Sequence, residues 1–251
     1  MHKALRVLVP LAAAATPLAL MSSATAAGTS YQTTLNPLNH ASGTGMATIS
    51  LQGNTANIHV SWSGLAATFN GSPYPHVQHI HVGGQGQCPT TSADKNGDGV
   101  ISTTEGGPAY GGIGTTLSEH GDTSPAAGTN IKIAPSSGST DYQRTINVSS
   151  KVAAAIRDGS AVVVVHGLDP STLSKKAQNE KSDLVKSLPL AATSPALCGV
   201  LTAMPTGGVA TGTGSTAGVE NQGLLEAGGA LVLVGGLALY GVRRRRTTIG
   251  V

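Results

Sequence analysis

The chain has 251 residues, with 15 Lys and Arg against 12 Asp and Glu, a formal net charge of +3 and only 3% aromatic residues. That positive charge belongs to the two ends, because residues 27–223 contain nine Lys and Arg and eleven Asp and Glu, a net charge of −2. The sequence has no basic patch with interleaved aromatic residues, so we exclude a nucleic-acid partner. The middle of the chain is long enough for one domain with its own hydrophobic core.

The first 26 residues have the pattern of a secretory signal. Lys3 and Arg6 form a basic start, Val7 to Met21 is an apolar run, and Ala24-Thr25-Ala26 matches a small-x-small cleavage site. We therefore predict a signal peptide over residues 1–26 and export of the remainder.

The C-terminal segment predicts a membrane anchor. Leu224 to Val242 is almost wholly apolar, and Arg243 to Arg246 follow it directly. Nineteen helical residues at about 1.5 Å each reach roughly 28 Å, close to the thickness of the hydrocarbon core. The arginines favour a cytoplasmic tail over 243–251 and a type I transmembrane helix over 223–242. A sortase-type signal is the alternative, although no LPxTG motif is present and Met204 to Gly207 is only similar to one.

Between the signal and the anchor, residues 27–205 read as one β-rich domain, followed by a flexible Gly- and Thr-rich stalk over 206–222. Apolar and polar residues alternate in several short runs separated by Gly-rich turns, which is typical of antiparallel sandwiches and barrels. A hairpin is expected from Met46 to Trp62, in which Ile58, Val60 and Trp62 share one face and His59 lies on the other. The further predicted elements are strands at 76–82, 142–148, 161–166 and 196–201 and a short helix at 151–157.

The chain has two cysteines, Cys88 and Cys198, both in the exported part. An oxidising compartment favours a disulfide between them over two free buried thiols. Such a bond would close a loop of 110 residues. The chain-entropy model gives about 4–5 kcal/mol of stabilisation for a loop near 100 residues.

An acidic loop over residues 94–105 has the spacing of a calcium-binding loop. Side-chain oxygens recur at its first, third and fifth positions, a glycine stands at the sixth, a backbone carbonyl is available at the seventh, and a glutamate stands at the twelfth. The predicted calcium ligands are Asp94, Asn96, Asp98, Val100, Ser102 and Glu105.

The segments that flank this loop, CPTTSA and GGPAYGG, do not predict the two amphipathic helices of a calcium sensor. Without two flanking helices whose relative angle can change, calcium binding cannot drive a conformational switch of the sensor type. We therefore predict a structural calcium site beside Cys88.

Three histidines form a second candidate site. His79 and His81 are two positions apart in a predicted strand, so their side chains point to the same face, as two ligands of one metal would. His166 ends the strand AVVVVH and can reach that pair only through the fold. Neutral imidazoles suit copper or zinc, and the alternative is a buried hydrogen-bonded cluster without metal.

The order of three segments gives a family resemblance. The segments HIHVGGQGQC at 79–88, VVVVHGLD at 162–169 and ALCGVL at 196–201 resemble segments of Cu/Zn superoxide dismutases. The closer resemblance is to exported bacterial CHRD-domain proteins, several of which have a similar acidic run and a stretch like GDTSPAA at 121–127. This resemblance, over roughly residues 30–203, implies a Greek-key β-sandwich without an established general activity.

Carried over by position, the resemblance to the dismutases implies that His79, His81 and His166 are copper ligands and that Cys88 pairs with Cys198. The expected zinc ligands are incomplete, because His120 is the one histidine between Cys88 and His166. A proline at position 195 replaces the arginine that would guide superoxide.

The sequence thus predicts an all-β, antiparallel Greek-key sandwich or barrel with one C-terminal transmembrane helix. The favoured function is a non-enzymatic, calcium-binding module at the cell surface with an unidentified extracellular ligand. The alternative is a copper- or zinc-binding redox enzyme or metal carrier that uses the three histidines. A calcium-dependent adhesion protein is a third possibility.

Overall fold

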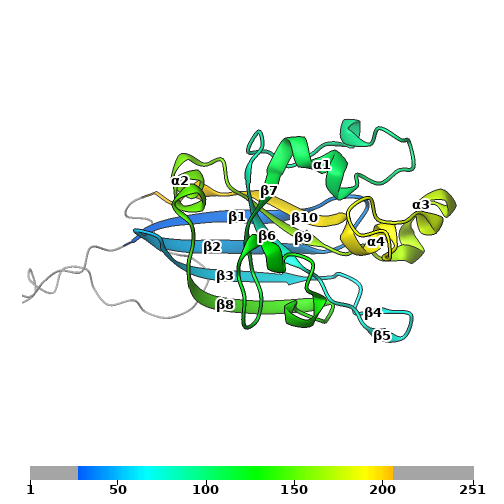
Figure 1. The fold of residues 1–251 in the computed structure, drawn as a ribbon, viewed down its shortest axis with the longest axis horizontal. Coiled ribbons are helices and arrows are strands. Elements are labelled where there is room, and N and C mark those ends of the chain that lie inside the picture. The colour runs from blue at the N-terminus through cyan, green and yellow to red at the C-terminus, as the bar shows by residue number, and fades with distance from the viewer. Residues whose placement is uncertain (1–27, 206–251) are drawn as a thin grey trace, which may run out of the picture. The chain divides into compact units, whose positions relative to one another are not determined.

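The structure is a computed structural model, and it describes residues 28–205 (Figure 1). The predicted signal peptide, stalk, membrane helix and basic tail all lie outside these residues. Within residues 28–205, no helix is both long and apolar enough to cross a membrane.

The described part of the chain is built around one curled antiparallel sheet of nine strands, in the order β7-β6-β9-β10-β1-β2-β3-β8 with β11 beside β1. The strands of this sheet are β1 (Thr29–Pro37), β2 (Thr44–Gln52), β3 (Thr55–Ser63), β6 (Gln78–Gly83), β7 (Gly111–Thr116), β8 (Ser139–Asn147), β9 (Val162–His166), β10 (Pro195–Val200) and β11 (Thr202–Ala203). A small hairpin of β4 (Thr68–Phe69) and β5 (Ser72–Pro73) projects from one end. The all-β antiparallel class predicted from the sequence is confirmed.

Short helices cover the sheet and its ends. The α-helices are α1 (Thr103–Tyr110), α2 (Ser150–Asp158), α3 (Lys175–Asn179) and α4 (Leu190–Thr193). The 3-10 turns are η1 (Thr91–Ala93), η2 (Pro125–Ala127), η3 (Ile131–Ile133) and η4 (Pro170–Thr172). Figure 1 shows α3 and α4 together at one end of the sheet, near the ends of β9 and β10.

The β2–β3 hairpin follows the predicted alternation. Its strands pair in register from Thr44 with Ser63 to Gln52 with Thr55, across a two-residue turn at 53–54. Ile58 and Val60 are fully buried in the main core, whereas His59 lies on the other face, partly exposed and beside Asp141. Period-two alternation therefore placed the side chains of this hairpin correctly.

Strand β1 joins the two halves of the sheet. Its residues 29–35 pair with β2, whereas Asn36 and Pro37 pair with β10. The sheet curls about the apolar side chains of both halves, which form one core. Arg144 of β8 helps to hold the two outer strands near each other, because its guanidinium donates hydrogen bonds to the carbonyl oxygens of Ser118 and Gly121 in the segment after β7.

Strand β7 and helix α1 lie in the Gly-rich stretch for which the sequence predicted neither. β7 reads GGIGTT, and close packing requires two of its glycines, Gly111 and Gly114. A Cβ at Gly111 would lie 2.3 Å from the carbonyl oxygen of Val82, and one at Gly114 would lie 2.7 Å from a methyl carbon of Val152. Glycine is found here because the strand packs tightly against its neighbours. From composition alone, the same glycines would predict a loop.

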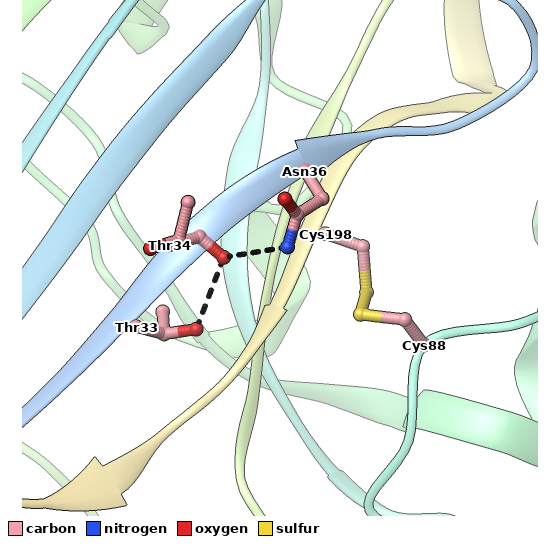
Figure 2. The surroundings of a disulfide bond; sticks show 5 residues. All are labelled: Thr33, Thr34, Asn36, Cys88 and Cys198. Atoms are coloured by element: carbon pink, nitrogen blue, oxygen red, sulfur yellow. Dashed lines mark hydrogen bonds between the residues drawn. A yellow bond between two sulfur atoms is a disulfide. The ribbon is translucent and has the colours of Figure 1, made fainter.

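The predicted disulfide between Cys88 and Cys198 is confirmed. Cys198 lies in β10 beside Asn36 of β1, and Cys88 comes from the segment after β6 (Figure 2). The bond therefore fastens the segment that leads into the acidic loop to the middle of the sheet.

Candidate metal centre

Strands β6 and β9 bring the three predicted histidines together. The two strands pair antiparallel, with His79 opposite Val164 and His81 opposite Val162, and His166 is the last residue of β9. The intervening residues of both strands, such as Ile80, pack into the main core. The histidines therefore project from the opposite face of the sheet, and all three are at most 3% exposed.

Each histidine ring is oriented by a hydrogen bond to a backbone carbonyl. Nε2 of His79 donates to the carbonyl oxygen of Gly128 at 3.0 Å, and Nδ1 of His81 donates to that of Gly111 at 2.9 Å. Nδ1 of His166 donates to the carbonyl oxygen of Thr193 at 2.7 Å. Because a carbonyl oxygen can only accept, these bonds fix the N–H on one nitrogen of each ring and leave the other with a lone pair.

The other ring nitrogen of each histidine points toward the other two histidines: Nδ1 of His79, Nε2 of His81 and Nε2 of His166. Each of these atoms is buried and has no hydrogen-bond partner among residues 28–205. The three atoms lie within 4.8 Å of one another. Among residues 28–205, this is the one group of three or more His, Cys, Asp or Glu side chains that converges in this way.

Burial also keeps these rings neutral. It lowers the pKa of His81 to about 3 and that of His166 to about 4, and repulsion from the neighbouring ring of His166 adds to the effect on His81. The pKa of His79 is lowered well below its usual value by burial and by the two other rings. At neutral pH the three free nitrogens therefore carry lone pairs rather than protons, which is the state that a metal ion requires.

The histidines line a cavity of about 200 Å³ whose other walls are mostly apolar. Phe69, Val77, Ile113 and Leu188 are among the lining residues, which come from segments far apart in the sequence. No Lys, Arg, Asp or Glu side chain from residues 28–205 lines it.

Two other histidines have different surroundings. His76 is fully buried, and both of its nitrogens lie 2.9 Å from carbonyl oxygens, those of His166 and Ala66. Burial lowers the pKa of His76, but its ring leaves no nitrogen free for a metal. His120 is exposed and lies outside the convergent group, so the structure does not supply the missing zinc ligand of the resemblance.

The acidic loop is closed by hydrogen bonds to its own backbone. The Asp94 carboxylate accepts from the backbone N–H groups of Gly97 and Gly99, and the Glu105 carboxylate accepts from those of Lys95 and Ser102. No three carboxylates of residues 28–205 converge as the histidines do. Calcium binding by Asp94, Asn96, Asp98, Val100, Ser102 and Glu105 therefore stays a prediction.

The exit from this loop is a helix that the sequence analysis did not predict, because GGPAYGG lies largely in α1. Helix α1 begins directly after Ser102, which accepts a hydrogen bond from the N–H of Glu105 while the Glu105 carboxylate accepts from that of Ser102. This capping box outweighs the poor helix propensity of the glycines. A Cβ at Gly106 would lie 2.5 Å from the ring of Tyr110, so glycine lets that ring fold back along the helix. On the entry side there is only the 3-10 turn η1.

Helix α1 connects the acidic loop to the histidines. The ring of Tyr110, at its end, packs edge-on against His81 with ring centroids 4.6 Å apart. At its start, the hydroxyl of Thr103 donates to the carbonyl oxygen of Thr193, the same atom that accepts from His166. The sequence analysis did not single out Tyr110, Thr103 or the carbonyl of Thr193, because their roles depend on contacts between distant segments.

Comparisons with known proteins add little to this geometry. No protein-family model matches the chain, and no curated protein matches it. Among solved structures, the chain is similar to a point mutant of Candida albicans superoxide dismutase 5, with 16% sequence identity and a TM-score of 0.37. That match covers 74% of this chain and 99% of the dismutase chain. A likeness this distant carries no argument about activity, so the function is argued from the site itself.

Proposed function

We propose that this domain binds a copper or zinc ion through His79, His81 and His166. The observation that carries the proposal is the convergence of three buried nitrogens that have no hydrogen-bond partner within the described residues. Leaving a buried polar atom unpartnered costs roughly 1–3 kcal/mol, so three such atoms at one point represent a substantial loss of stability. Coordination would remove that loss, whereas the alternative of a hydrogen-bonded histidine cluster leaves it in place.

The donor set suits these metals. Neutral imidazole nitrogen is a good ligand for copper and zinc, and three protein ligands with one open position are typical of catalytic rather than structural zinc sites. Bond lengths of about 2.0–2.1 Å in a tetrahedral site imply nitrogens about 3.4 Å apart. Because the nitrogens lie within 4.8 Å of one another, each pair would have to approach by at most about 1.4 Å to reach this spacing.

The carbonyls of Gly128, Gly111 and Thr193 would act as the supporting shell. Each holds one ring by its N–H, which fixes the tautomer and makes the opposite nitrogen more basic. A bound copper ion would supply one-electron redox chemistry, and zinc would supply a Lewis acid. Since no cationic side chain of residues 28–205 lines the cavity, guidance of a superoxide anion has no support in this part of the chain, and we propose binding without assigning a reaction.

Metal content of the purified full chain tests this proposal. The chain is expressed with export and with copper and zinc supplied, and the bound elements are measured by mass spectrometry. We expect about one copper or zinc per chain in the wild type and none in a His79→Ala, His81→Ala variant. The matched control is His120→Ala, which removes an exposed histidine and should keep the metal. Absence of copper and zinc from the wild type after loading would overturn the proposal.

We propose calcium binding by the acidic loop as a second role. It is supported by the spacing of the ligands and by the capping box, which brings Ser102 and Glu105 to adjacent places at the start of α1. Glu180, far along the chain, brings a further carboxyl group to the loop. Its side chain is hydrogen-bonded to Asp98, and this contact raises the pKa of Glu180. Calcium titration calorimetry of the full chain, with Glu105→Gln as the comparison, tests this role. Equal heats for both proteins would reject it.

We further propose that the chain is a CHRD-domain protein displayed outside the cell membrane. This proposal rests on the signal pattern, the apolar segment followed by arginines, and the motifs shared with that family. The disulfide supports it, because disulfides form in an oxidising compartment. Protease treatment of intact cells should digest residues 28–205 while the basic tail stays with the membrane fraction. Protection of both parts would contradict this arrangement.

A further inference from the structure

The cavity beside the three histidines has properties that the metal site alone does not explain. Its volume of about 200 Å³ is far larger than one ion needs. An engineered apolar cavity of about 150 Å³ binds benzene, so this space is large enough for one aromatic ring with small substituents. It is also smaller than the roughly 300–1,000 Å³ of pockets for drug-sized ligands.

The walls of the cavity favour an apolar occupant. They include Phe69, Val77, Ile113, Pro189 and Ala192, and no charged side chain of residues 28–205 is among them. An anion with its own hydration shell would lose that shell here without gaining a cationic partner. A hydrocarbon body, by contrast, would be removed from water at no such cost.

Exposed apolar residues also mark this cavity. Among residues 28–205, three large hydrophobic side chains are exposed: Met46, Ile131 and Leu184. Ile131 and Leu184, each about half exposed, line the cavity, although they are more than 50 residues apart in the sequence. Exposed apolar groups gathered at a pocket are typical of a binding site rather than of an ordinary surface.

We propose that this cavity binds a small, mainly apolar organic molecule of about one substituted ring, which carries a single metal-binding donor atom. The donor atom meets the open position left by three protein ligands, and the ring occupies the apolar space beside the histidines. This inference rests on the proposed metal binding, because the donor atom needs a metal to reach. It assigns a ligand class that differs from the small inorganic anion implied by the dismutase resemblance.

Two probes that share a donor and differ in their apolar body test the inference. Imidazole offers the nitrogen alone, and 1-phenylimidazole adds one phenyl ring. The full chain in mild detergent is loaded with Co²⁺, whose visible absorption reports a change of coordination, and each probe is titrated. The fraction of probe held by protein-free micelles is measured and subtracted. We expect 1-phenylimidazole to bind at least tenfold more tightly than imidazole.

A filled cavity provides the decisive comparison. In Ala192→Phe the new ring occupies the cavity, so the preference for 1-phenylimidazole should fall to less than threefold while the affinity for Co²⁺ is kept. The matched control is Ala154→Phe, which places the same ring at an exposed position of α2 outside the cavity lining and should behave as the wild type.

The outcomes separate the two proposals. If Co²⁺ binds with an unchanged requirement for His79 and His81 but both probes bind equally, the ligand class is wrong and the metal site stands. If Co²⁺ does not bind to the wild type, the metal site and the inference built on it are both wrong. If Ala192→Phe keeps the full preference, the phenyl ring lies elsewhere and the cavity is not its site.

Discussion

The metal-free protein should lose stability steeply as the pH falls from 7 to 5, because its buried histidines must remain neutral in the folded state. In the unfolded chain a histidine has a pKa of about 6.5. In the fold, burial lowers that of His81 to about 3 and that of His166 to about 4. Below pH 6.5 the unfolded state therefore binds protons that the folded state cannot, and the stability falls.

The size of the effect follows from these values. At pH 5 the unfolded chain is almost fully protonated at both sites, whereas the folded chain is almost unprotonated, so each histidine removes about 2 kcal/mol. The two together remove about 4 kcal/mol, a large part of a typical stability of about 5–15 kcal/mol. His79 and His76, whose pKa values are also lowered by burial, act in the same direction. The loss continues below pH 5, down to the folded-state pKa values of His81 and His166, so only the part between pH 6.5 and 5 precedes the titration of carboxylates with ordinary pKa values.

Urea unfolding between pH 7.5 and 5 measures how the free energy of unfolding depends on pH. The signal is the fluorescence of the buried Trp62, the single tryptophan of the chain. The His81→Gln variant should reduce the difference in free energy of unfolding between pH 7 and pH 5 by about 2 kcal/mol. His120→Gln, at an exposed site, should leave that difference unchanged. A wild-type stability that varies by less than about 1 kcal/mol over this range would refute the reasoning, because it would mean that the rings are hydrated.

Three further outcomes are expected. Replacing both cysteines by serine should lower the free energy of unfolding by about 4–5 kcal/mol, measured in urea, because the disulfide closes a loop of 110 residues; a loss below 1 kcal/mol would contradict this. Gly128→Ala should weaken zinc binding about 10–100-fold in a chelator competition. A Cβ there would lie 2.4 Å from the Ile113 side chain and 3.3 Å from Nε2 of His79, which should disturb the carbonyl of residue 128 that orients this ring. Gly112→Ala, in open space, should have no effect. Glu105→Gln should abolish calcium binding and also weaken zinc binding by up to about tenfold; full retention of the zinc affinity would show that the two sites are independent.

The histidine site could be predicted from the sequence only as far as local periodicity reaches. Alternation along β6 placed His79 and His81 on one face, and the valine run of β9 ended at His166. That β6 and β9 are neighbours follows from the topology, which could be predicted only through a family resemblance. The carbonyls that orient the rings could not be predicted, because every residue has a carbonyl and its identity carries no signal.

Glycine caused the main errors of the sequence interpretation. The sequence predicted no helix or strand from Gly106 to Gly114, yet this stretch contains most of α1 and the first part of β7. Glycine is unfavourable in both kinds of element by propensity, and here it is required by contacts with Tyr110 and Val82 that a linear sequence does not display. The apolar cavity was missed for a similar reason, since its walls come from separate segments that show no common pattern.

The acidic loop and the histidines, read as two separate motifs in the sequence, are mechanically joined in the fold by α1. An ion in the loop would hold the Glu105 carboxylate in place. Because Glu105 forms the capping box with Ser102, the ion would also stabilise the start of this helix. From there, the hydroxyl of Thr103 shares the carbonyl acceptor of His166, and the hydroxyl of Tyr110 donates to the carbonyl of Thr103 while its ring packs against His81. Disorder at the start of α1 would thus loosen two of the three rings. A calcium site that is structural for the fold would in this way also pre-organise the metal site, which is why the Glu105→Gln variant should affect both.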